Sequence, residues 1–180
     1  MLTRALGIMV LFLLIGCGAK KKRTYSKTRT VTVEASPEES PPPKKSKKED
    51  RKNAKAERII STAMTFAGTR YKFGGTTRKG MDCSGLVFVS LQENDIVFPR
   101  VSYQMAERGK RIKVGQVEKG DLLFFNTGKS RKRINHVGLV VDVTKNEIKF
   151  IHATTSRGVI VSSLREGYWN HAFVKAMRIL

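Results

Sequence analysis

The apolar positions of the chain follow a helical spacing in its middle part. Between residues 49 and 67 the apolar side chains recur every three or four positions, which places them on one face of a helix, and Gly68 follows as a stop. The members of this face are Ile59, Ile60, Ala63, Met64 and Ala67. After a Gly-rich loop, the apolar run 84–92 predicts a short buried helix, and another short helix is expected over 102–108.

The second half of the chain has the pattern of β-strands. Apolar and β-branched residues dominate five runs, which are 121–125, 136–143, 147–152, 158–161 and 173–179. Lys145-Asn146, between the second and third runs, indicates a hairpin turn. Helices first and an antiparallel sheet afterwards predict an α+β fold, with N-terminal helices packed on the sheet.

The N-terminus has the features of an export signal. Arg4 precedes an apolar run, 5–16, that is shorter than the roughly 20 residues needed to span a bilayer, as in secretory signal peptides. The run ends at Leu14-Ile15-Gly16-Cys17, which resembles the lipobox of bacterial lipoproteins. This resemblance implies that residues 1–16 are removed and that Cys17 is lipidated. Because Gly18 and not Asp follows, it also implies an anchor in the outer membrane, facing the periplasm. The alternative is an ordinary signal peptide with a chance cysteine.

Composition divides the remaining chain into a tether and one domain. Residues 17–52 are rich in Lys, Arg and Pro and poor in large apolar side chains, so they cannot bury enough apolar surface to offset the entropy of ordering. We predict a basic tether over 17–52 and a single domain over 53–180.

The basic character is not confined to the tether. Of the net charge of +20, +8 lies between Lys20 and Arg58 and +1 on Arg4, which leaves +11 on the rest of the chain. In an intracellular protein this charge would suggest nucleic acid. The export signal instead favours anionic envelope polymers or lipid head groups, and we expect no nucleic-acid partner. A charged surface kept for solubility is the alternative.

A lone thiol lies at the start of a predicted helix. The chain has two cysteines, and with Cys17 lipidated Cys83 has no intramolecular partner. In an oxidising compartment such a thiol is a liability unless it is buried or used. Cys83 directly precedes the helix 84–92, whose positive N-terminal end is expected to stabilise a thiolate and lower the pKa.

Two histidines are expected near one another in the sheet. His136 begins one strand and His152 ends the next, so a hairpin brings both to one end of the sheet, and because both numbers are even we expect a shared face. A thiol beside an imidazole forms a thiolate–imidazolium pair, with a third polar group to orient the ring. Cys83, His136 and His152 fit these roles. They are also zinc-type ligands, but no fourth ligand is visible, so we expect neither a metal nor a cofactor.

Five sequence blocks resemble a known family. They are Arg70-Tyr71-Lys72-Phe73-Gly74-Gly75, Asp82-Cys83-Ser84-Gly85, Gly120-Asp121-Leu122-Leu123-Phe124-Phe125, His136-Val137-Gly138 and Ile151-His152-Ala153. In order and spacing they resemble the NlpC-type cell-wall peptidases, papain-like enzymes with a Cys-His-His arrangement. The resemblance extends over essentially all of 59–180.

The resemblance assigns roles to the catalytic candidates. It implies Cys83 as nucleophile, His136 as general base and then acid, and His152 as the residue that orients His136. Tyr71 matches a family tyrosine whose hydroxyl helps to stabilise the oxyanion. Without the resemblance, Tyr71 would be interpreted as a half-buried aromatic beside a turn.

The resemblance also suggests substrate contacts. Asp82 and Ser84 flank the cysteine and in some relatives contact the substrate's amine, although Asp82 suits a helix cap equally well. Arg100 and Ser102 match a segment near the cleft and are expected to contact substrate. Trp169 has no matching block and is interpreted as packing near the C-terminus.

The resemblance implies a cysteine-type murein endopeptidase, a hydrolase that acts through a thioester. Its partners would be peptidoglycan stem peptides and, through the lipid on Cys17, the membrane; we expect a monomer. Cleavage of the D-Ala–diamino acid cross-link is favoured over cleavage between D-Glu and the diamino acid. One alternative is a non-catalytic peptidoglycan-binding lipoprotein scaffold. Another is acyl or amide transfer on a lipid.

Overall fold

The computed structural model describes residues 46–128 and 133–180. The predicted signal peptide (1–16), the predicted lipidation site at Cys17 and most of the predicted tether lie outside these residues. Within the described residues, no helix has the length and apolar character required to cross a membrane.

The first helix, α1 (Lys47–Met64), begins inside the stretch assigned to the tether. Ser46 caps it, because the Ser46 hydroxyl accepts a hydrogen bond from the backbone N–H of Glu49 at 3.3 Å, and two acidic residues lie in the first turn. Of the predicted apolar face, Ile59, Ile60 and Ala63 are buried, together with Ala56. Met64 and Ala67 were wrongly assigned to it: Met64 is exposed at the last position of the helix, and Ala67 is exposed beyond it. The helix ends near Gly68, which has the positive φ of a stop, 81°. Its first turns are therefore set by capping and charge, not by apolar burial.

Two further helices and a small hairpin follow α1. The short helices are α2 (Cys83–Gln92) and α3 (Ser102–Met105), and both lie within or next to the ranges predicted for them. The two-residue strands β1 (Thr76–Thr77) and β2 (Gly80–Met81) pair antiparallel just before α2. They had not been predicted, because each is too short to show an alternating pattern.

The main sheet has six strands, and every neighbouring pair is antiparallel. Their order is β3-β8-β4-β5-β6-β7. Five of the strands were predicted: β4 (Leu122–Phe125), β5 (His136–Val143), β6 (Ile148–Thr154), β7 (Gly158–Ser163) and β8 (Phe173–Arg178). The sequence did not indicate the edge strand β3 (Lys110–Ile112), the 3₁₀ turn η1 (Val114–Gln116) or α4 (Gly167–Ala172). The α+β fold is confirmed.

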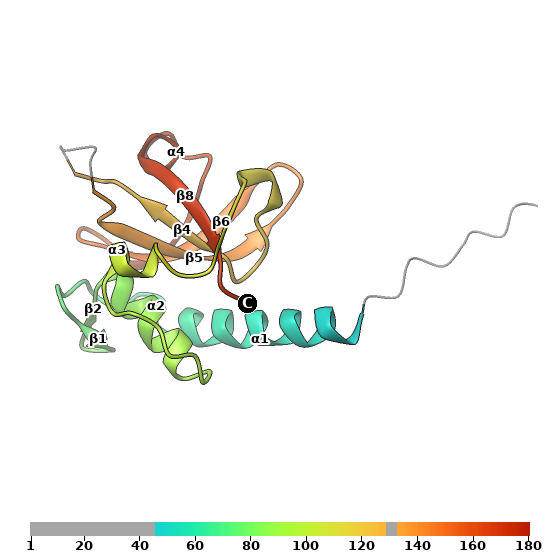
Figure 1. Ribbon diagram of the computed structural model, residues 1–180. Helices are drawn as coiled ribbons and strands as arrows, with labels where there is room; N and C mark the ends of the chain where they lie inside the picture. Colours follow the sequence, from blue (N-terminus) through green and yellow to red (C-terminus); the bar gives the residue numbers. More distant parts are fainter. Residues whose placement is uncertain (1–45, 129–132) are drawn as a thin grey trace, which may run out of the picture. The chain divides into compact units, whose positions relative to one another are not determined.

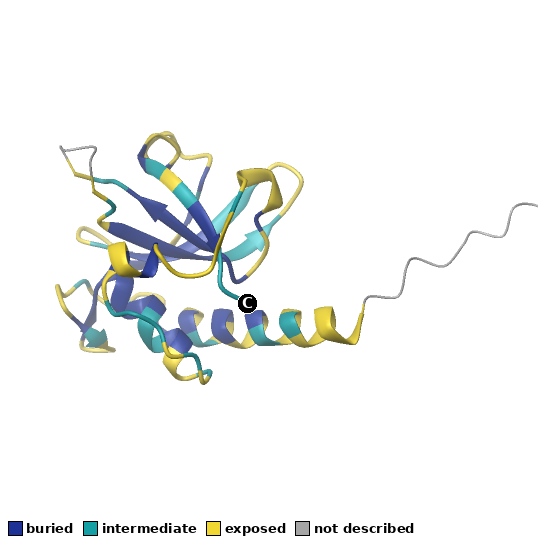
Figure 2. Cartoon of the chain, viewed as in Figure 1, coloured by how far each residue is buried: buried dark blue, intermediate teal, exposed yellow. Residues whose placement is uncertain are grey.

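The two faces of the sheet are covered by different elements (Figures 1 and 2). On one face, Val137, Leu139 and Ile151 belong to the apolar cluster that also contains the buried residues of α1 and α2. On the other, Phe125 and Phe150 form a second cluster with residues of α4. In Figure 2 the burial of α1 is confined to its second half, nearest α2. The α4 face is the one that carries the predicted histidines.

An extra residue in β5 decides on which face His152 lies. The turn at Lys145-Asn146 is confirmed, and near it Val143 pairs with Ile148 and Asp142 with Lys149. The register then shifts, so that Val140 pairs with Phe150 and Leu139 with Ile151. Val141 is the additional residue of this bulge.

The bulge corrects the reasoning that both histidines share a face because both numbers are even. In the register of the turn, His152 would lie opposite Leu139 and so on the face away from His136. The shift at Val141 moves His152 opposite Gly138, which is two positions along β5 from His136. The shared face is therefore real, and its cause is the bulge.

Candidate active site

Cys83 is the first residue of α2 and is 8% exposed. Burial raises the pKa of its thiol, and the negative charge of Asp82 raises it further, while backbone hydrogen bonds with Val137, Ser84 and Cys83 itself lower it. The net direction is opposite to the one expected from the helix terminus, because burial outweighs the favourable backbone groups. The thiol therefore needs a nearby base to take its proton.

The two histidines form a direct hydrogen bond. Nε2 of His136 lies 3.0 Å from Nδ1 of His152, with the two rings nearly perpendicular. Burial lowers the pKa of His136 to about 4, partly offset by the charge of Asp82. Burial also lowers the pKa of His152, and the nearby charges of His136 and Arg157 add to this. Both rings are therefore neutral near pH 7, the state in which an imidazole can accept a proton.

Tyr71 is held beside the thiol by backbone contacts. It forms an isolated bridge with Met81, and the flanking bonds run from Met81 N–H to the Arg70 carbonyl (3.1 Å) and from Lys72 N–H to the Met81 carbonyl (3.2 Å). Burial raises the pKa of its hydroxyl, and the charges of Cys83 and Asp82 add to this. The hydroxyl is therefore a protonated hydrogen-bond donor at neutral pH.

The Asp82 carboxylate is surrounded by donors from its own chain. It accepts hydrogen bonds from the backbone N–H groups of Gly74 (2.7 Å) and Gly85 (2.6 Å) and from the Ser84 hydroxyl (3.3 Å). Arg100 pairs with both carboxylate oxygens at 3.0 Å and also donates to Ser84 at 2.8 Å. Asp82 is 7% exposed. Its predicted role as a helix cap is confirmed, and the Arg100 guanidinium joins it to the loop before α3.

Two adjoining cavities meet at Cys83. One, of about 600 Å³, is lined by Tyr71, Cys83, His136 and Trp169 among others. The other, of about 470 Å³, also includes Tyr71 and Cys83. Its further lining contains all four of the predicted substrate contacts, Asp82, Ser84, Arg100 and Ser102.

The predicted site residues thus fall into three groups. Tyr71 and Cys83 lie at the junction of the cavities, His136 lines the larger one, and His152 lies behind His136 with no exposure to solvent. The predicted substrate contacts line one cavity only, and Ser102 is itself buried. Cys17 lies outside the described residues. Within the described ranges, no group of three or more His, Cys, Asp or Glu side chains is arranged to hold a metal ion.

Trp169 belongs to the site, although the sequence analysis assigned it to packing alone. Its ring contacts both histidines, with centroid distances of 5.1 Å to His136 and 4.4 Å to His152. The only signal in the sequence is an aromatic pair, Tyr168-Trp169, in a short polar segment. The contact itself depends on how α4 packs over the sheet.

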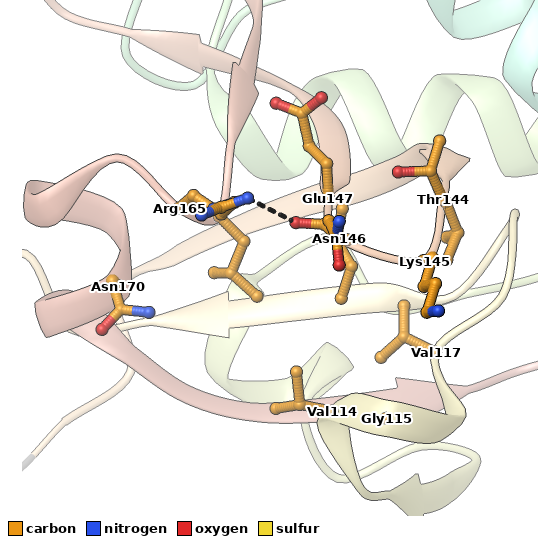
Figure 3. A pocket seen from close by; sticks show the side chains of 12 residues that line it. Val114, Gly115, Val117, Thr144, Lys145, Asn146, Glu147, Arg165 and Asn170 are labelled. Carbon is orange, nitrogen blue, oxygen red and sulfur yellow. Dashed lines mark hydrogen bonds between the residues drawn. The ribbon is translucent and has the colours of Figure 1, made fainter.

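A separate hollow of about 410 Å³ lies at the other end of β5, around the β5–β6 turn (Figure 3). Val114 and Val117 line it from one side, and the turn residues Lys145 and Glu147 from another. Arg165 donates a hydrogen bond to the Asn146 carbonyl at 3.1 Å across its rim. None of the residues that line it is a cysteine or a histidine. In the part of the chain that the structure describes, the candidate residues Cys83 and His136 instead line the cavity at the opposite end of β5.

Comparison with known proteins matches this site to a family. Residues 68–178 match the NlpC/P60 family, a range that contains Tyr71, Cys83, His136 and His152. The chain belongs to the NlpC/P60 family.

Two bacterial relatives are similar in sequence to this NlpC/P60 chain. It is 37% identical over 124 residues to "Murein DD-endopeptidase MepS/Murein LD-carboxypeptidase" of Escherichia coli (strain K12), covering 68% of this chain and 62% of the relative. It is 41% identical over 116 residues to "Probable endopeptidase NlpC" of the same organism, covering 64% of this chain and 72% of that protein. The chain thus spans about three-fifths of the length of the first relative.

A solved structure supports the fold of this NlpC/P60 domain. An NlpC/P60 family protein from Bacillus cereus ATCC 10987 superposes with a TM-score of 0.63 at 27% identity, covering 69% of this chain and 40% of that one. The antiparallel sheet with N-terminal helices is therefore the architecture of the family.

Proposed function

We propose that this protein is a cysteine peptidase that hydrolyses peptide bonds of peptidoglycan, with Cys83 as nucleophile. The observation that carries the proposal is the 3.0 Å hydrogen bond between His152 and His136, with His136 on the wall of the same cavity as a free, buried thiol. A thiol, a base and a group that orients the base are the minimum for nucleophilic acyl transfer. The match to two relatives named as endopeptidases supports the same reaction.

In the first half of the reaction the peptide bond is broken. Because Nε2 of His136 is engaged with His152, Nδ1 of His136 is the nitrogen that takes the Cys83 proton. The sulfur attacks the scissile carbonyl carbon, and the oxyanion is stabilised by the Tyr71 hydroxyl and the backbone N–H of Cys83. The C–N bond then breaks as His136 returns the proton to the leaving amine, which leaves a thioester on Cys83.

In the second half water replaces the amine. His136 takes a proton from water as the water oxygen attacks the thioester carbonyl, and the C–S bond breaks. The thiolate recovers the proton from His136, and the carboxylate product leaves. Throughout, His152 Nδ1 accepts the Nε2–H of His136 and so keeps the imidazole in one orientation.

We further propose that the cut falls in the D-Ala–diamino acid cross-link and not between D-Glu and the diamino acid. The name of the 37% identical relative includes a DD-endopeptidase activity, which supports this choice. The state of Asp82 supports it as well. Its carboxylate already has four partners, so it is poorly placed to bind the free amine that some relatives bind with the corresponding residue.

The site of action proposed for the protein is the cell envelope. The sequence Leu14-Ile15-Gly16-Cys17 supports lipidation of Cys17 and an outer-membrane anchor facing the periplasm. The basic segment between Cys17 and α1 would then give the domain reach from the membrane to the wall.

Digestion of cross-linked peptidoglycan tests the proposed activity. The protein without residues 1–17 and its Cys83→Ala variant are each incubated with purified sacculi under reducing conditions, and the released muropeptides are identified by mass spectrometry. We expect cross-linked dimers to become monomers with the unsubstituted protein only. Products cut after D-Glu would contradict the proposed bond, and no change with either protein would favour a non-catalytic scaffold.

A further inference from the structure

The orientation of His152 depends on one hydrogen bond and on packing. The ring has no exposure to solvent, Nδ1 is bonded to His136, and Nε2 has no hydrogen-bond partner among the described residues. A single hydrogen bond does not stop an imidazole from rotating about its Cβ–Cγ bond. The faces of the ring must therefore be held by neighbouring side chains.

Two aromatic rings hold those faces. Phe150 lies 4.7 Å from His152 between ring centroids, tilted by 35°, and Trp169 lies 4.4 Å away in an edge-to-face arrangement at 79°. Trp169 also stacks on His136 at 5.1 Å with an interplanar angle of 24°. Among the described residues, the indole is therefore the aromatic side chain that contacts both histidines and also lines the cavity with Cys83.

Trp169 is itself fixed. It is 5% exposed, and it packs edge-to-face against Phe125 at 5.2 Å and Phe150 at 5.6 Å. These contacts attach α4 to β4 and β6, the strands on either side of β5. A rigid aromatic cluster can hold its neighbours in one orientation more strictly than a loop side chain can.

We propose that Trp169 is a positioning residue of the active site, which closes the His136–His152 pair to water and holds both imidazoles in their reactive orientation. The inference rests on the proposed function and adds to it a residue that the sequence motifs do not include. Trp169 acts through the histidines and not on the substrate's reacting atoms.

Two physical effects follow from this placement. Excluding water keeps the Nε2···Nδ1 hydrogen bond in a region of low dielectric, where it is stronger and has fewer competing partners. The stacked indole face also attracts a positive charge, so it favours the imidazolium that forms when His136 takes the thiol proton. This attraction opposes the burial that disfavours a charged His136.

Substitutions of Trp169 separate positioning from general packing. Trp169→Leu removes the aromatic face, Trp169→Phe keeps a smaller one, and Phe173→Leu serves as the matched control. Phe173 packs at 6.1 Å on Phe125 and belongs to the rim of the same apolar cluster, one ring removed from the histidines. Thermal unfolding of each variant identifies any that fail to fold.

Three measurements are made on each folded variant. The first is the rate at which iodoacetamide alkylates Cys83 near neutral pH. The second is the exchange of the imidazole N–H protons, followed by ¹⁵N-edited NMR of the histidines. The third is kcat and KM on purified cross-linked muropeptides. The first two need no substrate, so they test the role of Trp169 even if the proposed peptidase activity fails.

For Trp169→Leu we expect alkylation and kcat to fall by about tenfold, with KM within about twofold, and the N–H signals to be lost through faster exchange. Trp169→Phe should keep most of the alkylation rate, and Phe173→Leu should behave as the unsubstituted protein. The proposal is overturned if Trp169→Leu keeps both the alkylation rate and the protected N–H signals. It is also overturned if Phe173→Leu lowers alkylation as much as Trp169→Leu does.

Discussion

The burial of His136 links the stability of the protein to pH. The pKa of its imidazole is lowered by burial from 6.5 to about 4. Above pH 6.5 the imidazole is neutral in both the folded and the unfolded chain. Between pH 6.5 and about 4 the unfolded chain binds a proton that the folded chain does not, so the free energy of unfolding falls as the pH falls. The free energy of unfolding lost between pH 6.5 and about pH 4 through this group is roughly 3 kcal/mol.

Urea unfolding at several pH values measures this effect. We expect the free energy of unfolding to decrease from pH 7 toward pH 4, and we expect His136→Gln, which has no titrating ring, to show a shallower decrease. The lowered pKa of His152 acts in the same direction, so some slope should remain in that variant. Equal slopes for the two proteins would show that His136 does not titrate as its burial requires.

The contacts of Asp82 show which of its two predicted roles, helix cap or substrate contact, the carboxylate has in the structure. Asp-Cys-Ser suited both a substrate contact and a helix cap. The hydrogen bond from the backbone N–H of Gly85 at 2.6 Å is the cap that the sequence suggested. The pairing with Arg100 is visible only in three dimensions, because Arg100 comes from the loop after α2. The carboxylate is thus used to organise the N-terminus of α2, on which the position of Cys83 depends.

At the scale of elements, the two halves of α1 differ in burial. Its first half has no buried residues, whereas its second half packs into the main apolar cluster. Residues 46–52 contribute the Ser46 cap and the pair between Lys52 and Glu118, whose charged atoms are 2.9 Å apart at the surface. Ile59, by contrast, is 1% exposed in the main apolar cluster. The two parts should therefore make very different contributions to stability.

Truncation and substitution test this division of α1. A chain that begins at residue 53, the predicted domain boundary, should lose only about 1 kcal/mol relative to one that begins at residue 46. Ile59→Ala in the longer chain should cost about 3 kcal/mol, because it leaves a cavity beneath the sheet. Both are measured by urea unfolding. A truncation as costly as Ile59→Ala would mean that the domain begins before residue 53.

The strand β3 and the helix α4 were not predicted, and the physical reason is the same for both. In β3, two of the three residues are charged and both are exposed, so the strand has no apolar alternation to detect. The six residues of α4 contain too few positions to define a helical face. Both are stabilised by tertiary contacts, β3 by pairing with β8 and α4 by the aromatic cluster. Patterns in the sequence do not contain that information.

For the whole molecule, the fold class and the principal candidates of the site could be predicted from the sequence. The long apolar periods of α1, β5 and β6 and the five family blocks carry that information. The sequence could not predict that Trp169 covers the histidines, because its neighbours come from three other elements. Nor could it predict the net direction of the pKa shift of Cys83, which is set by burial.

From the positive charge of the whole chain we predict salt-dependent binding to the cell wall. Of the net +20, +11 lies on residues 59–180, and peptidoglycan stem peptides carry carboxylates. We expect the Cys83→Ala protein without residues 1–17 to sediment with purified sacculi at low ionic strength. We expect it to be released at about 1 M salt, where the Debye length is about 3 Å. Binding that does not depend on salt would favour the alternative that the charge serves solubility only.

Because of the bulge at Val141, the site depends on whether the number of residues within β5 and β6 changes by an odd or an even number. Inserting or deleting one residue between the histidines, in a strand that keeps its pairing, would rotate His152 to the opposite side of the sheet, whereas a change of two residues would restore it. Residues added at the Lys145-Asn146 turn lie outside the paired strands, so they leave the register and the face of His152 unchanged. For an engineer who wishes to attach a binding peptide to this end of the molecule, the turn therefore accepts inserts of odd or even length, whereas the bulge at Val141 must be kept.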